Sequence, residues 1–392
     1  MKTLVWLILD SSSILADIIN YTLLSFLLWQ DGQSVSLILQ FNLIVFTSLL
    51  MSSVVSGTLQ FILGTRLMFV AGMLMHAGIA WFAYMHSSEL SSHLTVVALA
   101  YGFANAAIQN AKNIMGLTMI PVAEMVSYSS RKEIIMSAGS VATPVITSVL
   151  IQNAGYPFSF QIMAGVFACI ALMSIVLKSK RITNQRFIVP QLLTRTLSVP
   201  SIRSLALIHI SIAISGVFGW GLLNIIILDV LGSLEGWTSV STALAAAGIV
   251  IALLLKSVKT RERSKSKSII VLSSLLYATA PILLLSSFTR ELFIVFTFVK
   301  LIYDKTNFIV TYNYLSQIEQ RDPDFDQHKL SFQIFNSFFM SAGRLIPVGI
   351  LLLLPADLLN INTLILGFSF VALAPLLFAR AYDREFQGGY LD

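Results

Sequence analysis

The chain has 392 residues, of which 56% are hydrophobic and only 11% are charged, and its formal net charge is +6. A soluble domain carries roughly a quarter charged residues, so this composition excludes an ordinary soluble protein. The mean hydropathy of +0.82 instead indicates long apolar helices, because roughly 20 apolar residues are needed to cross a bilayer.

Apolar runs of this length recur along the whole chain, and they predict an all-α integral membrane protein with twelve spans. The first run is interrupted by Asp10 and Asp17 and lacks a small-residue cleavage pattern, so we expect a span there rather than a signal peptide. The predicted spans cover residues 4–29, 35–63, 67–86, 94–119, 132–153, 158–178, 204–231, 237–256, 268–287, 291–318, 330–354 and 360–380.

Basic residues gather in the connections on one side of these spans. Six lie between the sixth and seventh spans and six between the eighth and ninth, whereas Arg290 alone marks the other side. Cytoplasmic loops carry the excess of lysine and arginine, so we expect both termini to be cytoplasmic in a multi-pass inner-membrane protein. The same residues can touch anionic lipid headgroups, and the positive charge therefore points to no nucleic-acid partner.

The longest connection splits the spans six and six. It predicts an N-terminal bundle of residues 1–178, a basic cytoplasmic linker of residues 179–203 and a C-terminal bundle of residues 204–392. The sequence MSAG begins at Met136 in the fifth span and again at Met340 in the eleventh. Spans four and ten align Lys112 with Lys305, and spans one and seven align Asp10 with His209, so we expect two pseudo-symmetric six-helix bundles.

The small residues of the repeated phrase have a physical role in such a fold. They allow helix backbones to approach closely inside a membrane, where no hydrophobic effect drives helices together. A proline follows each phrase and is expected to kink its helix. The predicted packing positions are Gly139, Pro144, Gly343 and Pro347.

The chain resembles the major facilitator superfamily over essentially its whole length. That family has a signature between spans two and three that reads roughly G-x-L-x-D-R-x-G-R-R. This sequence has GTLQFILGTR there, so that Gly57, Gly64 and Arg66 match, as does Leu59, while Phe61 and Ile62 replace the acid and the base. The resemblance implies a secondary transporter whose spans one, four, seven and ten line a central cavity, and the missing acid puts the gating role of this loop in question.

Polar residues inside spans are costly and are functional candidates by default. Those four spans carry most of the membrane-embedded charge of this chain. As proton-coupling candidates we take Asp17, Asp10, His209 and Asp304. As substrate-binding candidates we take Lys112, Lys305, Asn20, Asn105, Gln109, Asn113, Trp220, Asn224, Lys300, Asn307 and Arg344.

Two interpretations of the embedded charges stay open at this point. A carboxylate such as Asp17 can load and release a proton as it moves between wet and dry surroundings, while Lys112 and Lys305 bind an anionic substrate group. Alternatively, Asp10–Lys112 and Asp17–Lys305 are interhelical ion pairs that neutralise one another. Arg344 likewise either binds substrate or pairs with an acid such as Asp304, and His209 either shuttles protons or is hydrogen-bonded at a helix interface.

Other chemistry has little support in the sequence. His76, His86 and His93 lie near the outer ends of spans three and four, but their scattered spacing predicts no metal site. We find no phosphate-binding loop and no nucleophile–base constellation, so we expect neither a cofactor nor an enzyme.

The leading hypothesis is therefore a monomeric, proton-coupled secondary transporter. It would move a small amphipathic, zwitterionic or charged organic molecule by alternating access, with export favoured. The alternatives are an organic-acid uptake permease, and a lipid-moving or non-transporting assembly or sensor protein on the same fold.

Overall fold

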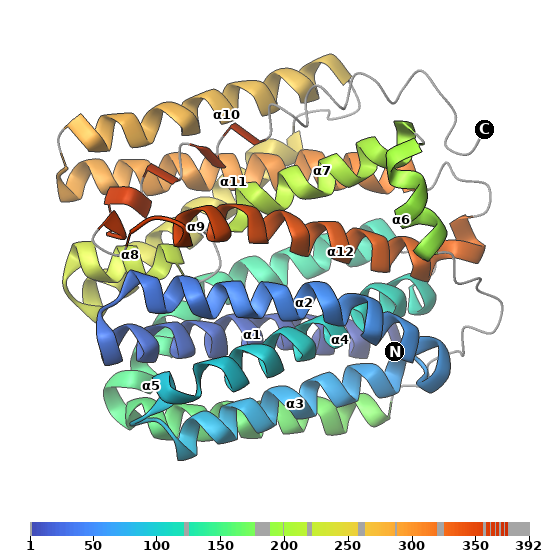
Figure 1. Ribbon diagram of the computed structural model, residues 1–392, viewed down its shortest axis with the longest axis horizontal. Helices are drawn as coiled ribbons and strands as arrows, with labels where there is room; N and C mark the ends of the chain where they lie inside the picture. Colours follow the sequence, from blue (N-terminus) through green and yellow to red (C-terminus); the bar gives the residue numbers. More distant parts are fainter. Residues whose placement is uncertain are drawn as a thin grey trace.

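The computed structural model describes residues 2–120, 125–176, 189–198, 200–217, 222–257, 263–286, 288–319, 325–355 and short stretches between 358 and 374. Within these residues the regular structure is helical, and the long helices lie side by side with their axes roughly parallel (Figure 1). Seven described helices are long and apolar enough to cross a membrane. One of these seven, α5, contains two predicted spans, and α11 is not among the seven.

The first four long helices match the predicted spans closely. They are α1 (Lys2–Gly32), α2 (Val35–Leu63), α3 (Thr65–Met85) and α4 (Leu94–Met119), with a short 3-10 helix, Leu90–His93, before α4. The connection between α2 and α3 is the single residue Gly64, whose φ of 88° is a conformation that side chains with a Cβ rarely adopt. The glycine of the loop signature is therefore needed for this tight turn.

The helix α5 (Met125–Ile175) runs through the fifth and sixth predicted spans. Its helical geometry breaks at Gly155, where φ is 70°, and this is the predicted connection between the two spans. Pro144 and Pro347 lie inside α5 and α12, and Gly155 rather than Pro144 is the residue with non-helical angles in α5. At the end of α5, the Arg66 guanidinium donates to the Ile175 carbonyl oxygen at 3.1 Å.

The remaining helices begin inside the predicted linker. Val189–Ser198 forms α6, a short amphipathic helix where only a loop was expected, and it packs on α7 (Pro200–Gly216). The seventh predicted span is divided into α7 and α8 (Leu222–Leu231), and residues 218–221 between them lie outside the described ranges. Then follow α9 (Leu234–Ser257), α10 (Arg263–Ser286), α11 (Arg290–Glu319) and α12 (Phe325–Leu352).

Helix packing repeats between the two ends of the chain. We call α1–α5 the first set of helices and α7–α12 the second set. In the first set α1 packs on α5, and in the second set α7 packs on α12. The two MSAG glycines lie at these contacts. A Cβ at Gly139 would lie 2.5 Å from the Leu15 side chain, and a Cβ at Gly343 would lie 2.6 Å from the Ile210 carbonyl oxygen. Larger residues at either position would force the first helix of each set away from its partner.

The two sets meet along two seams, α2 against α12 and α5 against α9. Figure 1 shows α2 beside α12 in the middle of the molecule. Any movement of one set against the other must therefore change the contacts along these seams.

Candidate functional site

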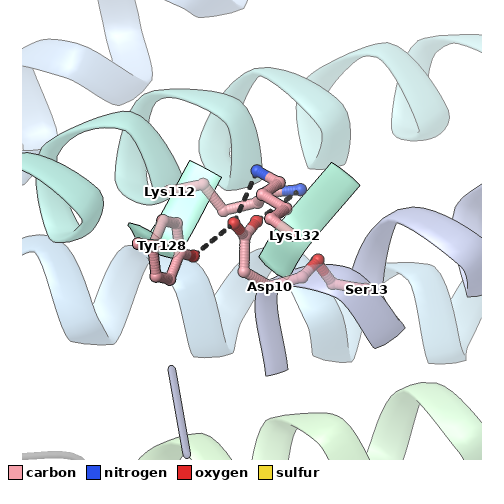
Figure 2. Close-up of polar contacts among 5 residues, drawn as sticks. All are labelled: Asp10, Ser13, Lys112, Tyr128 and Lys132. Carbon is pink, nitrogen blue, oxygen red and sulfur yellow. Dashed lines mark hydrogen bonds and ion pairs between the residues drawn. The ribbon is translucent and has the colours of Figure 1, made fainter. Parts of the chain in front are cut away.

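Three helices, α1, α4 and α5, bring charged side chains together around Asp10. Its carboxylate lies 3.2 Å from the Lys112 ammonium of α4 and 2.6 Å from the Lys132 ammonium of α5. The Tyr128 hydroxyl, one helical turn before Lys132, donates to the same carboxylate at 2.8 Å. Figure 2 shows these side chains converging, with the Ser13 hydroxyl turned to the Asp10 backbone carbonyl at 2.8 Å. We call Asp10, Lys112, Tyr128 and Lys132 the Asp10 cluster.

The Asp10 cluster is buried and carries an excess of positive charge. The Asp10 side chain is 5% exposed and the Lys112 side chain 13%, whereas that of Lys132 is 32% exposed. Removing one partner of a buried ion pair is costly because a charge is left uncompensated. Two ammonium groups share one carboxylate, and Lys132 can reach an anion through its exposed part.

A second cluster lies seven residues further along α1, at the middle of that helix. The Tyr101 hydroxyl of α4 donates to the Asp17 carboxylate, and the His76 imidazole of α3 lies 3.8 Å from the same oxygen. The His76 ring is fully buried, stacks on Phe167 at 4.9 Å and meets the edge of Tyr101 at 4.8 Å. We call Asp17, His76 and Tyr101 the Asp17 cluster.

The Asp17 cluster combines a partly exposed carboxylate with a buried imidazole. The Asp17 side chain is 26% exposed, whereas His76 is not exposed at all. No lysine contacts Asp17 among the described ion pairs, in contrast to Asp10.

The alternative in which Asp17 forms an ion pair with Lys305 is therefore not the arrangement seen among the described residues. Lys305 instead lies against α9, where its side chain is 3.2 Å from the position of a Cβ on Gly248. On α11, Lys300 and Asp304 form an ion pair one turn apart, and the Lys300 side chain is 2% exposed against 40% for Asp304. Asp304 thus pairs within its own helix.

Arg344 and the candidates on α7 and α8 lie outside the Asp10 and Asp17 clusters. The buried Arg344 guanidinium lies over the Phe46 ring of α2, 5.8 Å from its centre. The buried His209 ring is 2.8 Å from the Leu205 carbonyl oxygen of its own helix, as expected of a hydrogen-bonded interfacial histidine. Asn224 donates to the Thr22 hydroxyl of α1 at 3.5 Å, so it links α8 to α1.

The amide candidates on α1 and α4 differ in how far they are buried. Asn20 is fully buried, and neither of its amide atoms has a hydrogen-bond partner in the described chain. Asn105 is buried and Gln109 is half-buried. Trp220 and the side chain of Asn307 lie outside the described residues.

At the end of the molecule where α1 begins, α2, α4 and α12 are in contact. Asn113 donates to the Gln333 side chain at 3.0 Å, and Ser337 donates to Asn110 at 3.1 Å. A Cβ on Gly57 would lie 2.3 Å from Ile334. An apolar cluster lies at this contact and includes Val189 of α6. Its buried members are Ile114, Val189, Leu330 and Ile334. The N-terminal and C-terminal helices are thus joined at the end of the molecule where α1 begins.

At the opposite end, a cavity of about 550 Å³ separates the α1–α2 turn from the chain after α12. Its lining is rich in amide and hydroxyl groups; it comprises Trp29, Gln33, Ser34, Val35, Ser36, Leu359, Asn360 and Asn362. The two ends of the molecule therefore differ, because helices are in contact at one end and a polar cavity lies at the other.

The structure adds residues that the sequence pattern missed. Lys132, the first residue of the predicted fifth span, was not among the candidates, yet it contacts Asp10. Tyr101, Tyr128 and His76 had no periodic signal of their own, because aromatic residues are scattered through every apolar span. His76 was grouped with His86 and His93, but it lies with Asp17, while His86, Glu89 and His93 gather separately within 4.8 Å.

Comparisons with known proteins were informative at the level of structure only. The sequence matches no protein-family model and no curated protein. A bacterial homologue of the iron transporter ferroportin, in an inward-facing state, has a TM-score of 0.68 at 14% identity, over 98% of this chain and 99% of that one. The nucleoside transporter NupG gives 0.63 at 13% identity, over 95% and 100%.

A third solved structure agrees with these two. It is a bacterial homologue of the human lysosomal transporter Spinster, inward-facing and occupied, with a TM-score of 0.62 at 10% identity. It covers 97% of this chain and 96% of its own. At such low identity these likenesses establish the fold.

Proposed function

We propose that this chain, a multi-pass membrane protein with the major facilitator fold, is a proton-coupled secondary active transporter. Its two six-helix halves are residues 1–178 and 204–392, joined by the linker of residues 179–203. They rock against each other along the α2–α12 and α5–α9 seams around a central site. Both termini are cytoplasmic in this proposal, and one copy of the chain is sufficient.

The observation that carries the proposal is the Asp17 cluster. A carboxylate at the middle of α1 keeps 26% of its side chain exposed, yet it contacts a fully buried imidazole. A purely structural charge would be expected to resemble Asp10, which is enclosed by two ammonium groups and a hydroxyl. Asp17 therefore carries the coupled proton, His76 shares it, and Tyr101 orients the carboxylate.

The substrate is a small organic molecule that carries an anionic group and an apolar part. The two clusters and the candidate residues of α11 and α12 include five basic side chains, Lys112, Lys132, Lys300, Lys305 and Arg344, and three carboxylates, Asp10, Asp17 and Asp304. Buried aromatic rings lie beside these charges, as Tyr101 does beside Asp17. An amphipathic or zwitterionic molecule satisfies both features.

Export is the favoured direction, in exchange for an entering proton. The inner ends are closed by Asn113–Gln333 and Asn110–Ser337, and the polar cavity lies at the outer end. The contacts at the inner end support a conformation that is closed on that side, in which Asp17 loads its proton from outside and substrate leaves. The surplus of basic side chains favours uptake of an organic acid as the second candidate.

Dye-based transport in inverted membrane vesicles tests the proposal. The vesicles are energised to an acidic interior, and the recovery of a pH-sensitive dye is followed while amphipathic cations, zwitterions and organic acids are added. We expect at least one compound to cause recovery with the native protein, and Asp17→Asn to abolish it. The matched control is Asp31→Asn, since Asp31 is exposed at the far end of α1. Recovery that persists in Asp17→Asn would contradict the assignment.

A further inference from the structure

Three side chains that can bind metal ions lie together in the turn between α3 and α4. The proposed transport function does not use them. His86 ends α3, Glu89 precedes the 3-10 helix, and His93 ends that helix. One ligand atom from each of the three lies within 4.8 Å of the other two. The His86 Nδ1 atom is 3.1 Å from the Glu89 carboxylate. This group lies at the opposite end of α3 from Gly64, away from both charged clusters.

The turn is held in place by contacts that do not involve the ligand atoms. The His86 amide donates to the Phe82 carbonyl at 3.0 Å, and the Ser92 hydroxyl donates to the Glu89 carbonyl at 2.7 Å. Leu90, the residue after Glu89, is 1% exposed and anchors the turn in the apolar core. The Phe82 ring contacts both imidazoles, at 4.4 Å from His86 and 5.4 Å from His93. The backbone is therefore ordered before any ligand binds.

We propose that His86, Glu89 and His93 form a binding site for a divalent transition metal of the Zn²⁺ type. Two imidazoles and one carboxylate are the ligand set that such borderline ions take, with water in the fourth position. A tetrahedral Zn²⁺ with bonds of about 2.1 Å spaces its ligand atoms about 3.4 Å apart. The His86–Glu89 pair already meets that spacing, and the most distant pair must close by roughly 1.4 Å, within the reach of a surface rotamer change.

The charge and the accessibility of the group also favour a borderline divalent cation such as Zn²⁺. Glu89 supplies one negative charge and is 60% exposed, while the His86 side chain is 35% exposed, so an ion can enter from solvent. Mg²⁺ and Ca²⁺ prefer oxygen ligands and would find only one carboxylate. The competing explanation is a hydrogen bond between His86 and Glu89 that merely stabilises the end of α3.

Isothermal titration of ZnCl₂ into the purified full-length protein, in detergent and without an affinity tag, separates these explanations. We expect one Zn²⁺ per chain and no binding of Mg²⁺. His86→Asn and His93→Asn should each weaken Zn²⁺ binding at least about tenfold, because loss of supporting contacts alone costs 10–100-fold at metal sites. Glu89→Gln keeps a partner for His86 but removes the charge, so it should weaken Zn²⁺ binding and leave the size-exclusion profile unchanged.

His328→Asn is the matched control, since His328 lies near the start of α12, far from the α3–α4 turn in the chain. It should bind Zn²⁺ as the native protein does. No saturable one-to-one binding by the native protein, or equal affinity in His86→Asn and His93→Asn, would overturn the metal site. Because the readout is binding rather than transport, failure here leaves the proposed transport function separately testable.

Discussion

Replacing Asp10 by Asn should destabilise the protein strongly, because the carboxylate neutralises two lysines at once. Its oxygens lie 3.2 Å from the Lys112 ammonium and 2.6 Å from the Lys132 ammonium. Breaking a buried ion pair by removing one partner costs about 3–5 kcal/mol. Lys132 is 32% exposed and can turn to water, whereas Lys112 is 13% exposed and cannot. We therefore expect the lower end, about 3 kcal/mol.

Thermal unfolding of the purified protein in detergent measures this cost. At about 2 °C per kcal/mol for a large chain, Asp10→Asn should lower Tm by about 6 °C. The double variant Asp10→Asn/Lys112→Met should recover most of that loss, because the uncompensated charge is gone. Asp31→Asn, an exposed control on the same helix, should stay within about 0.5 kcal/mol of the native protein. An Asp10→Asn protein of native stability, or one that Lys112→Met fails to rescue, would refute the reasoning.

Two further predictions concern contacts between helices. Gly343→Ala should cost about 1–3 kcal/mol because its Cβ meets the α7 backbone, whereas Gly349→Ala in the same helix meets nothing within 4 Å and should be neutral; equal Tm values for the two would contradict the packing. Asn113→Cys/Gln333→Cys, in a Cys169→Ser background, should be joined by a short cleavable thiol crosslinker that stops transport until it is cleaved. Transport that continues while the link is intact would exclude an opening at the inner end.

Much of the fold follows from the sequence, for a clear physical reason. Apolar length sets where a span begins and ends, and α2 and α4 cover residues 35–63 and 94–119 as predicted. Three solved transporter structures share the fold of this chain. The sequence did not predict α6, because its amphipathic ten residues acquire a partner only when α2, α4 and α12 come together.

The candidate site was less predictable, because depth along a helix is readable from sequence but rotation about its axis is not. Asp10 and Lys112 were one of the two possible ion pairs, and they do meet. Asp17 and Lys305 were the other, yet Asp17 contacts His76 and Tyr101 of neighbouring helices. A polar side chain that has one obvious partner in the sequence can thus contact a different residue once the helices pack. The tyrosines carry no charge, so the pattern of charges in the sequence gives no sign of their role.

Whether Asp17 carries the coupled proton is tested most directly in liposomes containing the purified protein and the compound that gave dye recovery. Two rates are compared for the native protein and Asp17→Asn: accumulation driven by a pH gradient, and exchange of labelled for unlabelled compound without a gradient. The account predicts that Asp17→Asn keeps exchange and loses gradient-driven accumulation, because the fold and substrate site remain while the proton carrier is gone. Accumulation at the native rate in Asp17→Asn would contradict it.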